Sequence, residues 1–460
     1  MGKAACFMEP KSEISFASKT NKNGKFPLRK TLNLYVEDTK PMTDNGTTIK
    51  IHSLIDKVYH PTNLMKAWEK VKENKGSGGI DNISISDFEK VQYKELDILN
   101  QRLKNDSYKP LPVRRVNIPK RNKPNEKRPL GIPAIRDRVC QQALKNRLEP
   151  IFEPTFNDCS FGYRPGKSTH QAMRKIYREI INGCEWVLDA DLRDFFGNVQ
   201  HELLINKIAE KVSDGRVLRL IRQMLEAGYI EKGKKHATTQ GTPQGGVISP
   251  LFSNIYLDSF DHEMVDKGYR LTRFADDWVV LCKTRNEVVK ALNDARQILS
   301  KIGLTLHPEK TRITHIKWGF EFLGYKIKHG KGLKLPRHKI KKQPNIINIY
   351  AIPTEKSVKR FMDTIRSRTK RRIPLSLFEL IESINPVIRG WGNYYRKAHV
   401  RKLFNKLQRW IVRRIWSHRF KRWRNMGWKK LHESKLYSAY KLVNLISLIP
   451  DLESKVASKG

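Results

Sequence analysis

The fold is decided by one stretch of chain, Arg273-Phe274-Ala275-Asp276-Asp277-Trp278, read together with Asp189-Ala190-Asp191 about 85 residues earlier. Each cluster joins acidic side chains to an apolar, strand-like run, before the first cluster and after the second. Burying unpaired carboxylates at strand ends is costly, so each cluster needs a compensating partner. Two divalent cations shared between the strands would be such a partner, whereas a solvated turn would explain either cluster taken alone.

Alternation along a strand predicts where these carboxylates point. Successive side chains of a strand face opposite sides, so Asp189 and Asp191 share one face with Val187, and the residues between them pack inward. The second cluster predicts a hairpin whose tight turn lies at residues 275–277. If the hairpin and the first strand are neighbours, their carboxylates lie a few ångströms apart, which is the arrangement that two Mg²⁺ ions require.

The composition indicates a folded protein with a polyanionic partner. The chain has 460 residues, which suggests two to four domains, and a formal net charge of +44, for which nucleic acid is the default partner. No run of about 18 apolar residues is present, so a membrane-spanning protein is not expected, and a basic membrane-surface protein is a distant alternative. The five cysteines lack C-x-x-C spacing, which argues against a zinc site or disulfides and fits a reducing cytosol.

Periodicity and helix breakers divide the chain into segments. Residues 1–55 are polar and basic and are expected to form a mobile arm. Prolines exclude a helix from residues 110–135, which read as strands and loops, and a helix is expected at about 136–148. Over residues 185–327, short apolar strands alternate with helices in a mixed α/β pattern. A basic linker region is bracketed by Pro336 and Pro353, and the pattern beyond it is helical.

Two further segments carry groups that could contact a ligand. Residues 241–246 read Gly-Thr-Pro-Gln-Gly-Gly, in which glycine allows close backbone approach and Gln244 offers a donor and an acceptor. Ser249 is expected to cap the following helix, with Pro250 at its first position, and an ordinary loop-to-helix junction is the alternative. Lys310 could lie near a leaving pyrophosphate, although a lone lysine is usually a solvated surface residue.

Residues 396–430 contain no Asp or Glu and many Lys and Arg. Apolar residues recur every four positions from Leu403 to Ile415, which predicts an amphipathic helix with one apolar and one cationic face. Because the cationic face lacks acidic partners at i,i+4 spacing, its self-repulsion requires a polyanion. The interspersed tryptophans are either core residues or platforms for base stacking.

Taken in order, these segments resemble the reverse transcriptases, and specifically the maturases encoded by group II introns. The resemblance covers about residues 56–430. One motif would be weak, but seven in the same order are highly specific. The matching pieces are residues 78–81, 113–120 with 128–133, 160–166, Asp191 with Phe196, 274–277, 322–325 and 388–395.

The resemblance implies an α+β fold: the fingers and palm of a right-hand polymerase, followed by an all-α thumb or maturase domain. The expected divisions are an N-terminal extension at 1–55, an N-terminal block with fingers at 56–184, a palm at 185–335, an RNA-binding thumb at 336–430 and a short tail at 431–460. Many family members carry a C-terminal HNH endonuclease with paired cysteines, and the roughly 30 residues after Lys430 lack that pattern. Second-strand cleavage by this chain is therefore not expected, and nicks or replication forks would supply primers.

The resemblance also implies roles for individual residues. Asp191, Asp276 and Asp277 would hold two Mg²⁺ ions, or Mn²⁺, with the Leu192 carbonyl as a further ligand. Lys120 and Arg128 would contact the triphosphate, Gln244 would position the nucleotide, and Lys310 would protonate the leaving pyrophosphate. Phe196 would lie under the sugar and exclude a 2′-hydroxyl, so that dNTPs are preferred. The expected RNA-binding residues are Arg114, Arg115, Arg164, Arg396, Arg401, Lys406, Arg409, Arg413, Arg414 and Arg422.

The implied function is an RNA-directed DNA polymerase that also binds its intron RNA to assist splicing and intron mobility. Its expected partners are intron RNA, an RNA template with a DNA primer, dNTPs and target DNA, in a cytoplasmic ribonucleoprotein and not at a membrane. The sequence does not indicate an oligomeric state. Two alternatives stay open: a non-catalytic splicing cofactor with a vestigial polymerase fold, and an intron-derived polymerase that serves defence or DNA repair.

Overall fold

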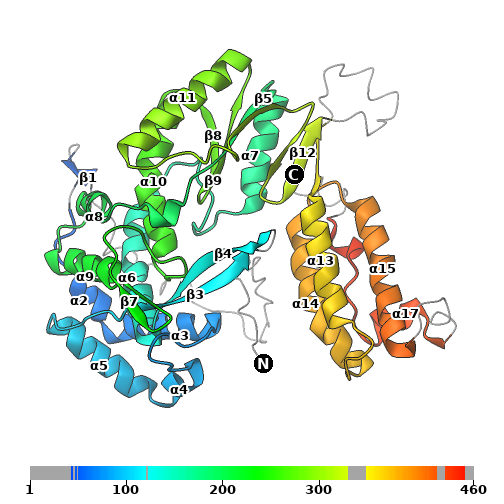
Figure 1. Cartoon of the computed structure of the whole chain (residues 1–460), viewed down its shortest axis with the longest axis horizontal. Coiled ribbons are helices and arrows are strands. Elements are labelled where there is room, and N and C mark those ends of the chain that lie inside the picture. The colour runs from blue at the N-terminus through cyan, green and yellow to red at the C-terminus, as the bar shows by residue number, and fades with distance from the viewer. Residues whose placement is uncertain are drawn as a thin grey trace, which may run out of the picture. The chain divides into compact units, whose positions relative to one another are not determined.

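The computed structural model describes residues 43–44, 47–48, 50–120, 123–329, 349–421 and 430–450. These residues fall into two compact units, of which the first ends at Ile313 and the second begins at Thr314 (Figure 1). Within the described ranges, no helix is both long enough and apolar enough to cross a lipid bilayer.

The first unit opens with helices that pack around α6 (Ile135–Phe152). Helix α3 buries Leu64, Trp68 and Val71 on one face, which the helical spacing of these residues predicts. The predicted helix at 136–148 is confirmed and extends four residues further. The smaller elements are α2 (Ile55–Tyr59), α3 (Pro61–Asn74), α4 (Ile85–Lys90) and α5 (Gln92–Lys104).

A four-stranded sheet forms the fingers, in the order β4-β3-β6-β7. Strands β3 (Val113–Lys120) and β4 (Lys123–Ile132) make an antiparallel hairpin, and β6 (Tyr229–Glu231) and β7 (Lys234–His236) extend it. The proline-rich segment therefore forms strands and loops, as predicted.

The second sheet of this unit is the palm, in the order β10-β5-β9-β8. Its strands are β5 (Trp186–Asp191), β8 (Arg270–Phe274), β9 (Asp277–Cys282) and β10 (Arg312–His315). The predicted hairpin is confirmed as β8–β9, and it is a neighbour of β5.

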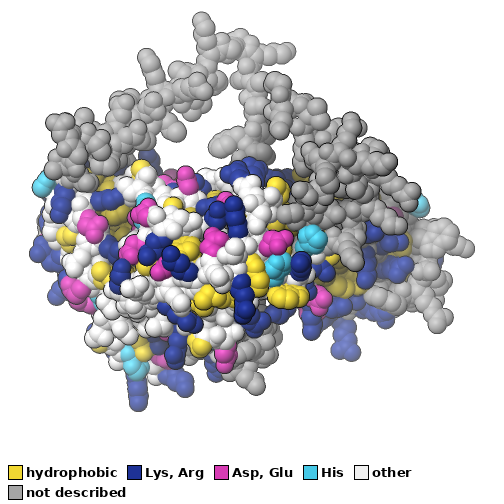
Figure 2. Space-filling model, turned by 90° about the horizontal axis from the view of Figure 1, so that it is seen from above, with side chains coloured by type: hydrophobic (Ala, Val, Ile, Leu, Met, Phe, Trp, Pro, Cys, Tyr) yellow, Lys and Arg dark blue, Asp and Glu magenta, His cyan; other side chains and the backbone are white. Residues whose placement is uncertain are grey.

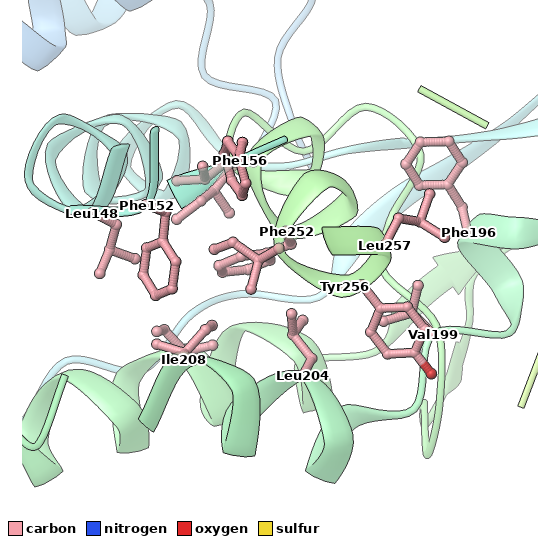
Figure 3. Packing of buried hydrophobic residues seen from close by; sticks show 14 of the residues in the cluster. Leu148, Phe152, Phe156, Phe196, Val199, Leu204, Ile208, Phe252, Tyr256 and Leu257 are labelled. Carbon is pink, nitrogen blue, oxygen red and sulfur yellow. The ribbon is translucent and has the colours of Figure 1, made fainter. Parts of the chain in front are cut away.

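Five helices complete the first unit. They are α7 (Thr169–Ile181), α8 (His201–Ala209), α9 (Gly215–Glu226), α10 (Ser249–Asp266) and α11 (Arg285–Lys301). Four of them, α8 to α11, contribute to the core that buries the inward face of the palm sheet, and α7 packs against β8 and β9 through buried residues outside that core. Leu188 and Ala190 of β5 face this core, as expected. Figure 3 shows part of it, where Phe252 and Tyr256 of α10 meet Leu204 of α8.

The second unit combines a small sheet with helices. Strands β11 (Phe320–Phe322), β12 (Tyr325–His329) and β13 (Ile349–Pro353) pair antiparallel. The helices are α13 (Glu355–Arg368), α14 (Leu377–Tyr395), α15 (Arg401–Phe420) and α17 (Glu433–Ser438). Strand β13 lies inside the predicted linker region, so part of that segment belongs to the sheet. Helix α15 buries Leu407, Ile411 and Ile415, which confirms the predicted apolar stripe.

Two local predictions differ from the structure. The end of the expected mobile arm is fixed: the Ile51 N–H donates to the Lys211 carbonyl at 2.9 Å, and the Leu54 N–H donates to Asp214 at 2.8 Å. Most of the arm lies outside the described residues. Ser249 is the first residue of α10 rather than its cap, because its hydroxyl donates to the Pro243 carbonyl at 2.9 Å instead of accepting from the helix.

Candidate active site

Asp191 and Asp277 lie directly opposite each other on adjacent strands. Asp191 ends β5, Asp277 begins β9, and the two residues are partners in the antiparallel register. Directly opposed residues in such a pair have Cα atoms about 4.5–5.5 Å apart. Their neighbours Ala190 and Trp278 form the next pair and are buried, while both aspartates are partly exposed. The sheet therefore places two carboxylates side by side at one end of its two central strands.

Asp276 lies in the two-residue turn that joins β8 to β9. Phe274 and Asp277 are register partners, so only Ala275 and Asp276 form the connection. Ala275 has a φ of 61°, in the left-handed region that residues other than glycine seldom adopt. The turn and the register together bring the three predicted carboxylates to one end of the palm sheet.

Residues far from this turn in the sequence hold it in place. A Cβ atom on Gly162 would lie 2.4 Å from the Ala275 nitrogen, so only glycine allows this close approach. Arg273 is fully buried, donates to the Ala275 carbonyl at 2.9 Å and forms an ion pair with the fully buried Asp261 of α10. Removing one partner of a buried ion pair leaves an uncompensated charge. Arg273 therefore ties the β8–β9 turn to α10.

Lys310 forms an ion pair with Asp191. The backbone brings the two residues together, because Leu192 bridges to Leu306 and the His307 N–H donates to the Asp191 carbonyl at 2.8 Å. The Lys310 side chain is 58 % exposed, so the pair adds little stability and leaves the ammonium group accessible to a ligand.

The backbone at Leu192 leaves its carbonyl outside the hydrogen bonds of the neighbouring bridge. The hydrogen bonds of its bridge run from the residues on either side, from the Arg193 N–H to the Thr305 carbonyl at 2.9 Å and from the His307 N–H to the Asp191 carbonyl. This pattern makes Leu192 a non-hydrogen-bonded position of the pair. Its carbonyl is therefore not used by the bridge.

Gln244, in the loop of residues 241–246, contacts Arg128 on strand β4 of the fingers hairpin. Arg128 Nε donates to Gln244 Oε1 at 2.8 Å, and the Gly131 N–H donates to the Gln244 carbonyl at 2.7 Å. Gly245 has a φ of 112°, and a Cβ atom on it would lie 2.5 Å from the Gly131 carbonyl oxygen. Glycine is required there, and it lets the loop lie against the fingers hairpin.

Phe196 is fixed next to the same loop. It lies in the short helix η3 (Phe195–Gly197) and is 9 % exposed. Figure 3 shows its ring beside Leu257 of α10. The Thr242 N–H donates to the Phe196 carbonyl at 2.8 Å, so the position of the ring and that of the Gln244 loop are coupled.

The electrostatics of Asp276 favour a bound cation. Burial raises the pKa of its carboxyl, the charge of Asp191 raises it further, and the charges of Arg128 and Lys310 lower it. Within the described part of the chain, no three His, Cys, Asp or Glu side chains are already arranged to hold a metal ion. The donor set at the sheet end consists of oxygen atoms, which suits a hard divalent cation. A cation there would offset both the burial and the repulsion between carboxylates.

Lys120 and Tyr163 are the remaining residues to place at the site. Lys120 is the last residue of β3, and its side chain lies outside the described part of the structure. Tyr163 was not predicted from the sequence: it is 51 % exposed, and its ring centroid is 6.5 Å from that of Phe274. Burial and the charge of Asp276 raise the pKa of its hydroxyl. A φ of 60° at a residue other than glycine was not visible in the sequence.

The structure contradicts the prediction that Arg164 binds RNA. Arg164 is buried and pairs with Glu153, and its guanidinium also donates to the carbonyls of Asn157 and Ser160 at 2.7 and 3.0 Å. All of these partners lie in the loop before α7. Arg164 therefore holds that loop together, and its five donors face protein acceptors rather than solvent.

Several other predicted RNA-binding arginines also contact protein groups. Arg114 donates to the Gly78 carbonyl at 2.7 Å, and the Arg115 guanidinium lies 3.2 Å from the Tyr229 ring centroid. Arg414 donates to the Thr369 carbonyl at 3.0 Å, and burial lowers its pKa. Arg396 is half-buried, and Arg422 lies outside the described residues.

The remaining predicted cations lie on the outer face of α15. Arg401, Lys406, Arg409 and Arg413 are exposed there, and α15 contains no acidic residue. Trp416 donates from its indole to the Leu431 carbonyl at 3.1 Å, which favours a structural role for that tryptophan. Figure 2 shows a different aspect of the molecule, where Lys and Arg side chains are spread over the surface with Asp and Glu between them.

A sheet end with paired carboxylates, a glycine-containing loop beside it and a fingers hairpin are the features of the class of right-hand nucleic-acid polymerases. Residues 118–327 match the family described as reverse transcriptase (RNA-dependent DNA polymerase), and residues 358–436 match the group II intron maturase-specific domain. The chain therefore belongs to the group II intron family of reverse transcriptases with a maturase domain, and its activity class is RNA-directed DNA polymerase.

Individual relatives show the extent of the likeness. The chain is 35 % identical over 321 residues to Protein YkfC of Escherichia coli (strain K12), covering 61 % of this chain and 84 % of that protein. It is 29 % identical over 413 residues to the group II intron-encoded protein LtrA of Lactococcus lactis subsp. cremoris, covering 72 % and 68 %. A solved Cas6-RT-Cas1–Cas2 complex shares 25 % identity with a TM-score of 0.36, covering 55 % of this chain and 42 % of that chain.

Proposed function

We propose that this site extends a DNA primer along an RNA template, with the primer 3′-hydroxyl attacking the α-phosphorus of a dNTP in line. The observation that carries the proposal is the register that sets Asp191 opposite Asp277, with Asp276 in the adjoining turn. Polymerisation of this kind needs positioned phosphates and concentrated negative charge more than it needs covalent chemistry from the protein.

The metal requirement is proposed as two Mg²⁺ ions held by Asp191, Asp276 and Asp277 with the Leu192 carbonyl. When bound there, the ions would lower the pKa of the attacking hydroxyl and neutralise charge on the leaving pyrophosphate. The raised pKa of Asp276 supports this assignment, because burial and then the charge of Asp191 disfavour its ionised form, and a bound cation would favour that form.

The cationic residues of the site orient the triphosphate and receive the leaving group. Arg128 is exposed at the fingers and donates to Gln244, so the two side chains lie together, and the remaining guanidinium donors can contact the triphosphate. Lys310 is held beside Asp191 and can turn from that carboxylate to donate a proton to pyrophosphate.

Phe196 supports selection of the sugar. The ring is held by its backbone bond to Thr242 and by the packing against α10, so it cannot move aside at low cost. A fixed ring under the sugar leaves no room for a 2′-hydroxyl, which favours dNTPs over rNTPs.

The second unit is proposed to bind the intron RNA through the outer face of α15. Arg401, Lys406, Arg409 and Arg413 supply charge that is not balanced along the helix. Charge on one exposed helix face suits RNA, which proteins recognise largely by shape and backbone. The RNA template, the DNA primer and the target DNA are proposed as the further nucleic-acid partners.

The test is primer extension on an RNA template with dNTPs and Mg²⁺, with the wild type beside Asp276→Ala. Extension by the wild type alone is the expected result. If neither protein extends the primer while both bind RNA tightly, the polymerase proposal fails, and a splicing cofactor with an inactive polymerase fold takes its place.

A further inference from the structure

A groove outside the catalytic site lies between α7 and the loop before it. The groove has a volume of about 410 Å³, and its lining includes Phe161, Lys167, Arg174, Lys175 and Arg178. Neither the metal site nor the face of α15 includes any of these residues.

The charges of the groove are not balanced. Its two acidic residues have cationic partners, since Asp158 pairs with Lys167 at 2.7 Å and Glu179 pairs with Arg270 at 3.4 Å. Among the residues that the structure describes, Arg174, Lys175 and Arg178 have no ion-pair partner. Three positive charges are therefore left for a ligand.

Lys175 is the least exposed of these three cations. Burial lowers the pKa of its ammonium group, although the charges of Glu179, Asp261 and Asp158 act to raise it. Because none of these carboxylates, which all lie in the described ranges, forms an ion pair with Lys175, a phosphate that binds in direct contact would offset its desolvation further. Arg174 and Arg178 are exposed one helical turn apart, about 6 Å, which allows both to reach one strand of phosphates.

The position of the groove indicates which nucleic-acid strand it would bind. Its Phe161 wall lies next to the catalytic turn, because the Phe161 N–H donates to the Arg273 carbonyl at 2.9 Å and Gly162 touches Ala275. The far end of the groove lies at the start of β8, where Glu179 meets Arg270. The groove therefore runs along the edge strand β8, away from Asp276.

We propose that this groove binds the sugar–phosphate backbone of the DNA primer strand behind its 3′ end, with Arg174, Lys175 and Arg178 as the phosphate contacts. The inference rests on the proposed polymerase function, because the primer is the strand whose end must lie at the catalytic turn. Intron RNA has the same phosphate chemistry but no requirement to end at that turn.

The test compares the full chain with the triple variant Arg174→Gln, Lys175→Gln, Arg178→Gln. The matched control is Arg285→Gln, Lys290→Gln, Arg296→Gln, which removes three exposed charges from α11 of the same unit. Binding of a labelled DNA primer on an RNA template is measured without metal ions, across a salt series. Binding of a primer-free group II intron transcript is measured in parallel.

The groove variant is expected to bind primer–template about tenfold more weakly, with a salt slope smaller by about two units, as loss of three phosphate contacts predicts. The α11 control and the intron transcript should change less than about twofold. Equal losses in the two variants would show a general charge effect and overturn the proposal. Loss of intron RNA binding alone would assign the groove to that RNA and overturn it as well.

A second measurement places the contact along the strand. Neutral methylphosphonate linkages are scanned along the primer, one at a time. In the wild type, neutral linkages behind the 3′ end should weaken binding, and the same linkages should have no further effect in the groove variant. Additive losses would overturn the assignment. Since binding is read without synthesis, failure of the wild type to extend primers would contradict the proposed polymerase separately.

Discussion

Two arginine-bearing regions of this chain use the same side chain in opposite ways. Around the β8–β9 turn, Arg164 and Arg273 are buried, and each has a carboxylate and further oxygen acceptors within hydrogen-bonding distance. On α15, Arg409 and Arg413 are exposed, and no acidic residue lies on that helix. The number of acceptors that the fold brings near each guanidinium decides whether it stabilises the protein or remains available to nucleic acid.

The largest expected effect separates catalysis from RNA binding. Asp276→Asn should reduce primer extension by at least about 10³-fold, because it removes a charge from the proposed metal site. Binding of RNA should stay within a few-fold of the wild type. Asp189→Asn is the matched control, since Asp189 lies on the same face of β5 but opposite Val279 rather than an aspartate. Comparable loss of RNA binding in Asp276→Asn would break the division between the two regions.

The second prediction concerns the contribution of the buried Arg164 to stability. Arg164→Ala should lower the free energy of unfolding by about 3–5 kcal/mol, because Glu153 and several carbonyls lose their partner. Arg413→Ala should change it by less than about 0.5 kcal/mol. Chemical denaturation of both variants measures this difference. If Arg164→Ala proved as stable as the wild type, the distinction between buried and available arginines would be wrong.

A third prediction uses the pH dependence of stability. Burial raises the pKa of Asp137 to about 6, although Tyr108 and the Leu111 N–H donate to its carboxyl. Between about pH 4 and pH 6 the folded state binds more protons than the unfolded state, so Asp137 makes stability fall as pH rises through this range. Asp137→Asn should remove about 1–3 kcal/mol of this fall. Identical pH profiles for variant and wild type would contradict the shift.

The sugar selection proposed for Phe196 should give a smaller effect. Phe196→Val keeps an apolar side chain and opens space near the backbone bond to Thr242. The preference for dNTPs over rNTPs should drop by about tenfold or more, measured as the ratio of kcat/KM values. Phe195→Leu is a neighbouring core control that should leave the ratio unchanged. An unaltered ratio in Phe196→Val would remove its proposed role.

The smallest expected effect comes from the exposed arginines. Arg409→Gln with Arg413→Gln should weaken binding of structured RNA a few-fold and reduce the salt slope by about one to two units. Primer extension on a short template should be unchanged, because both residues lie outside the catalytic unit. A flat salt profile in the wild type would show that phosphate contacts do not dominate this binding.

The sequence predicted the elements that a pattern within one short segment indicates. Alternation along β5 and the short Asp-Asp turn predicted the palm hairpin, and four-residue spacing predicted the buried stripe of α15. Alternation and the Asp-Asp turn also located the acidic clusters. Lys310 was assigned from the family resemblance, and the structure brings it to Asp191.

The remaining features depend on contacts between distant segments. Nothing around Arg164 in the sequence shows that Glu153 and four backbone carbonyls will surround it. Ser249 has the residue type of a helix cap, yet a tertiary contact with Pro243 takes its hydroxyl. Strand β13 was missed because its partner β12 ends about 20 residues earlier, so the two strands are not joined by a short hairpin that local sequence would indicate.

The pairing of β5 with β9 has a consequence for how this gene can vary. Since side chains alternate faces with each residue, one extra codon between Asp277 and Cys282 would shift every later side chain of β9 to the opposite face of the sheet. Trp278 or Val280 would then leave the core, or Asp277 would leave its place opposite Asp191. Length changes should therefore be excluded from these six codons, even where several amino acid replacements are accepted.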